Sequence, residues 1–333
     1  MNTVKKIYNS FYSKSTILAF LLLVVVSSIV FAEQNFFSST NAVNILLKAA
    51  KNGGFLALGM TFVILIGEID LSAGAVFGLS GVVMGIVGAT NPVLGIVAGL
   101  LTGVVSGILI GFMVTKMRIS SWIASLAMMF ALRGVISIIA HSSVAIPDGV
   151  MRFASLKFFK GFLGVKAGIS ILIPIFFALV FVCIYIGKHT KFGMGLYAVG
   201  GNKEAARMMG INVNRITMKA FICSGLIAAF SGVLLASNSG SATLSAGNIY
   251  ETYAIAMCAI GGVKLSGGEG KFSGTFFGIL IYFIINTIFT YLRGVTVHWQ
   301  SIIMGVLVLI SVGVQSEVFQ ELKASKKKWG MIK

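Results

Sequence analysis

The sequence predicts an all-α, polytopic membrane protein with about ten transmembrane helices and with both termini in the cytoplasm. Hydrophobic residues make up 57% of the 333 residues, and charged residues make up only 11%. The mean hydropathy is +0.98. Soluble domains are on average about 25% charged, so the nine acidic residues of this chain are too few for a soluble surface. The composition therefore excludes an ordinary cytosolic enzyme.

Apolar segments recur along the whole chain. A spanning helix needs about 20 mostly apolar residues. The candidate spans are 16–32, 52–67, 71–89, 92–115, 119–140, 169–187, 221–237, 251–263, 272–292 and 299–316. The first follows three lysines, as in a signal peptide, but it lacks a clear small-x-small cleavage site, so we expect a retained helix. Segments 52–67 and 251–263 are short, and for each a re-entrant segment is the alternative.

The basic residues predict the orientation. Lys and Arg number 26 and leave a net charge of +17. With both termini inside, eighteen of them face the cytoplasm, seven face outward and Arg133 lies within a helix. The chain is then one transmembrane domain, 1–333, with a basic N-terminus (1–15), a cytoplasmic loop (188–220) and a basic tail (317–333). No basic helix with stacking aromatic residues occurs, so we expect contact with membrane lipid and no nucleic-acid partner.

Two glycine-rich patterns concern the packing of the helices. Glycines recur at every fourth position on one face of the segment 92–115, where they let helix backbones approach closely: Gly95, Gly99, Gly103, Gly107 and Gly111. Residues 66–74 and 260–268 match at five of nine positions, and each lies between two apolar segments. Transporters are often built from related halves, although a glycine-rich chain also produces such matches by chance.

Four polar residues are candidates for a translocation pathway: Glu68, Asp70, Arg133 and Asn286. Acids near hydrocarbon are costly and usually face a cavity or a partner. Glu68 and Asp70 suit a polar lining or gate, or proton coupling; the simplest interpretation is a solvated turn at the cytoplasmic edge, where Asp70 caps the next helix. Arg133 lies toward the outer leaflet, where it either snorkels or faces the pathway.

The longest cytoplasmic loop carries a short helix. Residues 203–209 form about two turns, and Gly210 stops them. A short helix that projects from a membrane bundle suits a groove in a soluble partner. The alternative is a connector that lies on the membrane surface.

This helix carries a resemblance to a known family. Residues 204–210, EAARMMG, fit the EAAxxxG motif of ATP-binding-cassette importer permeases. The stretches GMTFVILIGEIDLSAG (59–74), GLYAVGGNKEAARMMGINV (195–213) and AIAMCAIGGVKLSGGEGKFSGTFFG (254–278) are similar to the inner-membrane permeases of ribose-type sugar importers. The resemblance extends from about residue 40 to residue 316.

The resemblance implies a multi-pass permease subunit in the bacterial inner membrane that translocates a sugar or sugar-like solute by alternating access. Its implied partners are cytoplasmic ATPase subunits, a second permease subunit, identical or different, and a periplasmic or extracellular solute-binding protein. ATP and Mg are bound by the ATPase, and no cofactor is implied in this chain. The resemblance places the following residues at the ATPase: Gly200, Gly201 and Asn202 in the turn before the helix, and Glu204, Ala205, Ala206 and Gly210 in the coupling helix itself. Glu68 departs from the family, which usually has glycine there.

Other chemistries lack their residues. The run 265–269, LSGGE, imitates the signature sequence of the ATPase subunits, but no GxxxxGK[ST] motif for phosphate occurs. The three cysteines and three histidines are scattered, so we expect no metal site and no enzyme. Permeases for branched-chain amino acids or nucleosides remain alternatives within the superfamily. A stand-alone ion-coupled secondary transporter is the alternative from another class, but it has no use for a docking helix.

Overall fold

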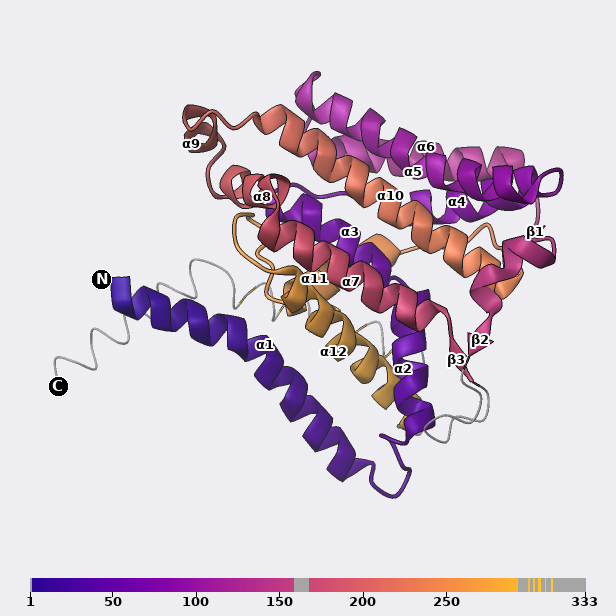
Figure 1. Ribbon diagram of the computed structural model, residues 1–333, viewed down its shortest axis with the longest axis horizontal. Coiled ribbons are helices and arrows are strands. Elements are labelled where there is room, and N and C mark those ends of the chain that lie inside the picture. Colours follow the sequence, from indigo (N-terminus) through magenta and orange to yellow (C-terminus); the bar gives the residue numbers. More distant parts are fainter. Residues whose placement is uncertain are drawn as a thin grey trace.

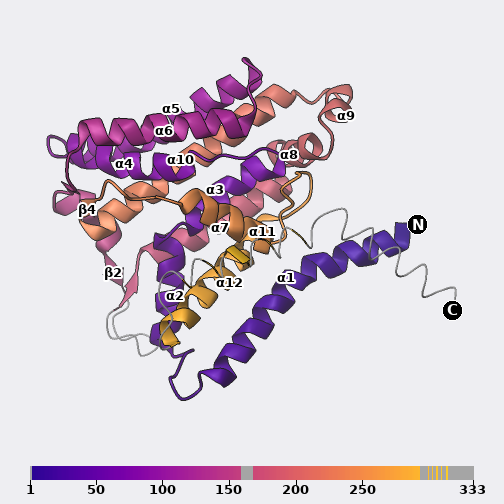
Figure 2. The ribbon, with the colours of Figure 1, turned by 180° about the vertical axis from the view of Figure 1, so that it is seen from behind.

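The computed structural model describes residues 2–158 and 168–292, together with a few helical positions between 299 and 313. The predicted span 299–316 and the basic tail 317–333 therefore lie outside the continuously described residues. Within those residues the chain is a bundle of helices (Figures 1 and 2), with two small antiparallel sheets at one end.

The helices are α1 (Asn2–Val30), α2 (Ser39–Lys51), α3 (Gly54–Leu65), α4 (Ala73–Gly88), α5 (Pro92–Thr115), α6 (Ser121–Ile139), the 3-10 helix η1 (Gly149–Ser155), α7 (Leu172–His189), α8 (Lys191–Gly201), α9 (Lys203–Met208), α10 (Val213–Ser239), α11 (Tyr250–Ile260) and α12 (Phe272–Tyr291). The strands are β1 (Val144–Ala145), β2 (Lys157–Phe158), β3 (Ile169–Ser170) and β4 (Ser241–Ala242). β1 pairs with β4 and β2 pairs with β3.

The bundle has two distinct ends. α8, α9 and the start of α1 lie at one end, which we call the α9 end, and the small strands lie at the other, the strand end (Figures 1 and 2). The connections 116–120 and 261–271 reach the α9 end, and each contains two Lys or Arg residues. Basic residues therefore gather at the α9 end, as the predicted cytoplasmic orientation requires.

Five helices in the described part are long and apolar enough to cross a membrane: α5, α6, α7, α10 and α12. Residues Thr16–Val30 of α1 and the helices α3 and α4 are shorter apolar helices. The all-α membrane fold is thus observed, whereas the count of ten spans stays a prediction. α10 is the most buried of the five spans and contacts α3, α4 and α5.

The two short predicted spans are short helices. α3 has 12 residues and α11 has 11, which gives lengths of about 18 Å and about 16 Å at 1.5 Å per residue. The hydrocarbon core is about 30 Å thick. Segments 52–67 and 251–263 therefore do not cross as single continuous helices, and the alternative of a partial crossing fits them better.

α3 and α11 lie side by side and point the same way. Gly53, before α3, lies against the ring of Tyr250 at the start of α11. Beyond the other ends, the Leu65 carbonyl accepts a hydrogen bond at 2.9 Å from the N–H of Gly268, in the connection that follows α11. Between them, Thr61 Oγ1 lies 3.4 Å from Cys258 Sγ. Both helices thus begin inside the bundle and end at the α9 end.

The two similar nine-residue segments occupy corresponding places. Residues 66–74 follow α3 and lead to α4, and residues 260–268 follow α11 and lead to α12. Each contains a glycine in the left-handed region, Gly67 at φ +75° and Gly262 at φ +80°. The order of short helix, glycine turn and longer helix therefore repeats, as expected of related halves.

The predicted cytoplasmic loop 188–220 is largely helical. It contains all of α8 and α9 and the first turns of α10, which begins at Val213 rather than at residue 221. Val213, Thr217 and Ala220 are buried, whereas Arg215 and Lys219 are exposed. This periodicity is that of an amphipathic helix. The segment 188–220 is polar when its residues are averaged, so the first turns of α10 were not expected from the sequence.

The glycine ladder of α5 lies between α4 and α10. All five glycines are buried. A Cβ at Gly99 would meet the Ser80 carbonyl of α4, and one at Gly103 would meet the Gly225 carbonyl of α10. Backbone therefore packs on backbone along this face, with no room for a methyl group.

We predict that Gly103→Ala destabilises the detergent-solubilised protein by about 1–3 kcal/mol, the usual cost of overpacking. Gly134→Ala in α6 is the matched control, because nothing lies within 4 Å of a Cβ there. Thermal unfolding followed by size-exclusion chromatography measures both variants. Equal stabilities would contradict the packing role of the ladder.

Candidate functional site

Helix α9 projects from its end of the bundle (Figure 1). Asn202 caps it, because its Oδ1 accepts a hydrogen bond from the Ala205 N–H at 2.9 Å. Gly210, at φ +78°, ends it in the left-handed conformation that favours glycine. Ala206 is buried and anchors the helix, while Met208 and Met209 are 85% and 67% exposed. The helix thus offers two apolar side chains outward.

Close backbone contacts connect α8 to the end of α3 and to the connection between α11 and α12. A Cβ at Gly200 would meet the Leu65 carbonyl and the Gly268 nitrogen. A Cβ at Gly267 would meet the Gly67 nitrogen. We call these four glycines, 67, 200, 267 and 268, the glycine junction. At this junction the two similar segments contact each other through Gly67 and Gly267, and Gly200 of α8, the helix that precedes α9, packs against them.

An ion pair joins α9 to the segment after α3. Lys203 Nζ lies 2.5 Å from Glu68 Oε1, and the Glu68 side chain is only 14% exposed. The next residue, Ile69, donates its N–H to Ser121 Oγ of α6 at 3.3 Å. Glu68 therefore connects α9 with the segment 66–72.

Asp70 is buried, with 1% of its surface exposed. Its Oδ1 accepts hydrogen bonds from the N–H and the hydroxyl of Ser72, at 2.9 and 2.6 Å, and its Oδ2 accepts one from the Ser224 hydroxyl of α10 at 2.9 Å. The solvated turn proposed from sequence is wrong. Segment 66–72 returns from the glycine junction into the bundle, where Gly74 lies against Gly247 and α10 covers it.

Arg133 of α6 contacts the segment that leads into α11. Its Nη1 donates to the Ala246 carbonyl, just before α11, at 2.8 Å, and it attracts the carboxylate of Glu251. Sequence analysis missed Glu251, although it is the only acid in the apolar segment 251–263. Its Oε2 is buried without a hydrogen-bond partner in the described part of the chain. The structure thus brings Arg133 near Glu251, whereas the fourth candidate, Asn286, lies half-buried on α12.

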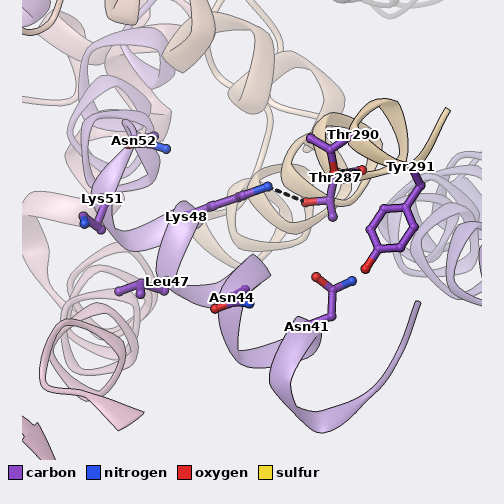
Figure 3. A pocket seen from close by; sticks show the side chains of 9 residues that line it. All are labelled: Asn41, Asn44, Leu47, Lys48, Lys51, Asn52, Thr287, Thr290 and Tyr291. Carbon is purple, nitrogen blue, oxygen red and sulfur yellow. Dashed lines mark hydrogen bonds between the residues drawn. The ribbon is translucent and has the colours of Figure 1, made fainter. Parts of the chain in front are cut away.

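A polar pocket of about 390 Å³ opens between α2 and the last turns of α12 (Figure 3). It is lined by Asn41, Asn44, Leu47, Lys48, Lys51, Asn52, Thr287, Thr290 and Tyr291. Lys48 Nζ lies 3.4 Å from Thr287 Oγ1. Sequence analysis missed this pocket, although the spacing of Asn41, Asn44, Lys48 and Lys51 marks one polar face of a helix.

The described residues hold no group of three His, Cys, Asp or Glu side chains placed to bind a metal. Near α9, burial raises the pKa of the Tyr197 hydroxyl. This hydroxyl therefore stays neutral at physiological pH and adds no charge beside α9.

A bundle of apolar helices with two helices that begin inside it, and a short capped helix that projects from one end, is a multi-pass membrane protein of the transport type. The chain belongs to the family described as the branched-chain amino acid transport system / permease component, whose pattern matches residues 41–312. The match spans α2 to α12 and includes every site described above.

Its relatives include sugar permeases. The chain is 38% identical over 297 residues to the ribose import permease protein RbsC of Bacillus subtilis, which covers 88% of this chain and 89% of the relative. It is 36% identical to RbsC of Escherichia coli K12, over 91% and 93% of the two chains. It is 32% identical to the galactose/methyl galactoside import permease protein MglC of the same organism, over 92% and 94%. No solved structure matches the chain.

We predict that Glu68→Gln increases trypsin cleavage at Arg207 about two- to fivefold, because the lost ion pair is worth up to about 1 kcal/mol. The exchange Glu68→Lys with Lys203→Glu should restore protection. Glu269→Gln is the control, because it breaks the 2.7 Å pair with Lys264 at the same end without touching α9. Equal cleavage of Glu68→Gln and the unaltered protein would argue against the connection.

Proposed function

We propose that this chain is the transmembrane subunit of an ABC importer that moves a sugar or sugar-like solute across the inner membrane. The observation that carries the proposal is α9: an EAAxxxG helix, capped by Asn202 and ended by Gly210, that projects from the basic end of a membrane bundle. The ribose and galactose permeases among its relatives support the sugar.

In this proposal α9 docks in a groove of the cytoplasmic ATPase subunit. Met208 and Met209 supply the apolar contact, and Glu204, Ala205 and Ala206 hold the helix in position. Apolar side chains at the centre of an interface usually carry most of its binding energy. ATP and Mg stay with the ATPase, and this chain carries out no chemical reaction.

Motion of α9 reaches the interior along two routes in the proposal. One is the Glu68–Lys203 ion pair, which pulls on segment 66–72 and on Asp70 within it. The other is the glycine junction, which joins α8 to the end of α3 and to the connection between α11 and α12. Because the nucleotide binds one state of the ATPase better, it shifts the bundle between inward- and outward-open states.

The remaining partners follow from this architecture. A second permease subunit, identical or different, completes the pathway, and a solute-binding protein docks on the strand end, at the outer loops 141–168 and 238–250, of which residues 159–167 lie outside the described part of the chain. Our candidates for the pathway are Asp70 in segment 66–72, Arg133 on α6 and Glu251 at the start of α11, because all three are polar groups within the bundle. A second, ATP-independent mode of transport has no support from the geometry of α9.

Purification of the tagged protein from native membranes, with mass spectrometry of the chains that accompany it, tests the proposal. An ABC ATPase should co-purify, and proteoliposomes that contain the complex and its binding protein should accumulate a sugar only with ATP inside. Uptake that follows an ion gradient without ATP would overturn the proposal.

We predict that Met208→Glu lowers ATP-dependent uptake about tenfold or more, because a charge replaces an apolar anchor of the ATPase contact. Met117→Glu is the matched control: Met117 is exposed at the same end, in the connection between α5 and α6. Both variants should reach the membrane in normal amounts. Unchanged uptake by Met208→Glu would remove α9 from the ATPase interface.

A further inference from the structure

The pocket between α2 and α12 lies away from α9 and from the glycine junction. Its lining comes from the whole length of α2 and from the end of α12, and α2 also contacts α7 (Figures 1 and 3). A volume of about 390 Å³ is in the range of small-molecule sites. The pocket therefore has the size and accessibility to hold a solute.

Its hydrogen-bonding groups suit a solute with several hydroxyls. Three asparagine amides, two threonine hydroxyls and one tyrosine hydroxyl line it, whereas Leu47 is the single aliphatic residue of the lining. An asparagine amide both donates and accepts, as does a hydroxyl. Asn41 uses one donor on the Phe36 carbonyl at 2.6 Å, and its side chain points toward the Tyr291 hydroxyl in Figure 3.

Two positive charges in the pocket are not balanced by acids. No ion pair joins Lys48 or Lys51 to an acid in the described residues. At the strand end, Asp148 pairs with Arg152, and Glu33 is exposed in the turn between α1 and α2. Residues 159–167 and 293–316 contain no Asp or Glu.

The surroundings disfavour these charges. Partial burial lowers the pKa of Lys48, and burial together with the charge of Lys157 lowers the pKa of Lys51. A bound anion replaces the lost solvation and attracts both ammonium groups, so it stabilises their charged forms. The pocket therefore favours a negative group beside Lys48 and Lys51.

We propose that this pocket binds a polyhydroxylated solute that carries one anionic group, a sugar acid or a sugar phosphate. Lys48 and Lys51 contact the carboxylate or phosphate, and the asparagines, threonines and Tyr291 contact the hydroxyls. The proposal rests on the proposed function and narrows its substrate class: the importer handles an acidic sugar in preference to its neutral counterpart.

The test is binding to the full-length protein in nanodiscs of phosphatidylcholine, by saturation-transfer NMR. The probes are matched pairs that differ in one anionic group: D-glucuronate with D-glucose, and D-ribose 5-phosphate with D-ribose. We expect at least one acidic probe to bind about tenfold more tightly than its neutral partner at low salt, with the preference reduced by added salt.

Three variants separate a local contact from the general positive field. Lys48→Met and Lys51→Met should each weaken binding of the acidic probe about tenfold and leave the neutral probe unchanged. Lys157→Met is the control, because Lys157 is exposed near Lys51 but does not line the pocket. An equal loss in the control, or equal binding within both pairs, would overturn the proposal.

Two further outcomes are distinguishable. One outcome is that neither acidic probe binds in phosphatidylcholine nanodiscs, whereas phosphatidylglycerol binds in a way that depends on Lys48 and Lys51. The pocket is then a lipid site and the proposal is wrong. ATP-dependent uptake of a neutral sugar without any preference for acids would refute this inference and leave the proposed function intact. Uptake that does not depend on ATP would refute the proposed function. The binding assay needs no transport and therefore tests the pocket independently of that function.

Discussion

The arrangement at the α9 end depends on backbone that packs directly on backbone. At the glycine junction, α8 approaches the last carbonyl of α3 so closely that Gly200 has no room for a Cβ, and Gly267 is similarly pressed against Gly67. In lipid the hydrophobic effect does not drive helices together, so van der Waals contact and hydrogen bonds must hold them. Small residues make both possible. The same principle acts along α5, where the glycine ladder meets carbonyl groups of α4 and α10.

These contacts determine where the two short helices lie. α3 and α11 begin inside the bundle, and the last residue of α3 and the connection that follows α11 meet at the glycine junction. Segment 66–72 holds Asp70 in the interior, and the first turn of α11 holds Glu251 within electrostatic reach of both Asp70 and Arg133. Irregular backbone at membrane depth is tolerated only where protein or a polar cavity satisfies it. The hydrogen bonds of Asp70 to Ser72 and Ser224 meet this requirement.

Charge distinguishes the two ends of the molecule. At the α9 end, Glu68 and Lys203 pair, as do Glu204 with Arg207 and Lys264 with Glu269. At the strand end, Lys48, Lys51 and Lys157 are joined to no acid in the residues described. Ion pairs of this kind hold contacts within the chain, whereas a pocket with unpaired lysines suits a partner that arrives with the opposite charge. The relatives named for ribose and galactose carry neutral sugars, so such a pocket would be a difference within the family.

The sequence by itself determined the membrane class, the bounds of α5, the short helix before Gly210 and the family, because composition, apolar runs and motifs are local properties. It failed where a property depends on distant residues. The loop 188–220 is polar on average, yet burial against the bundle makes α8 and the start of α10 helical. From the sequence, Asp70 is expected in a solvated turn, but the structure buries it against Ser224 of α10. No local pattern indicates that Glu68 contacts Lys203, which lies 135 residues away in the sequence. Only the tertiary structure places such pairs in contact, because their energies depend on distance and burial, and neither can be derived from spacing along the chain.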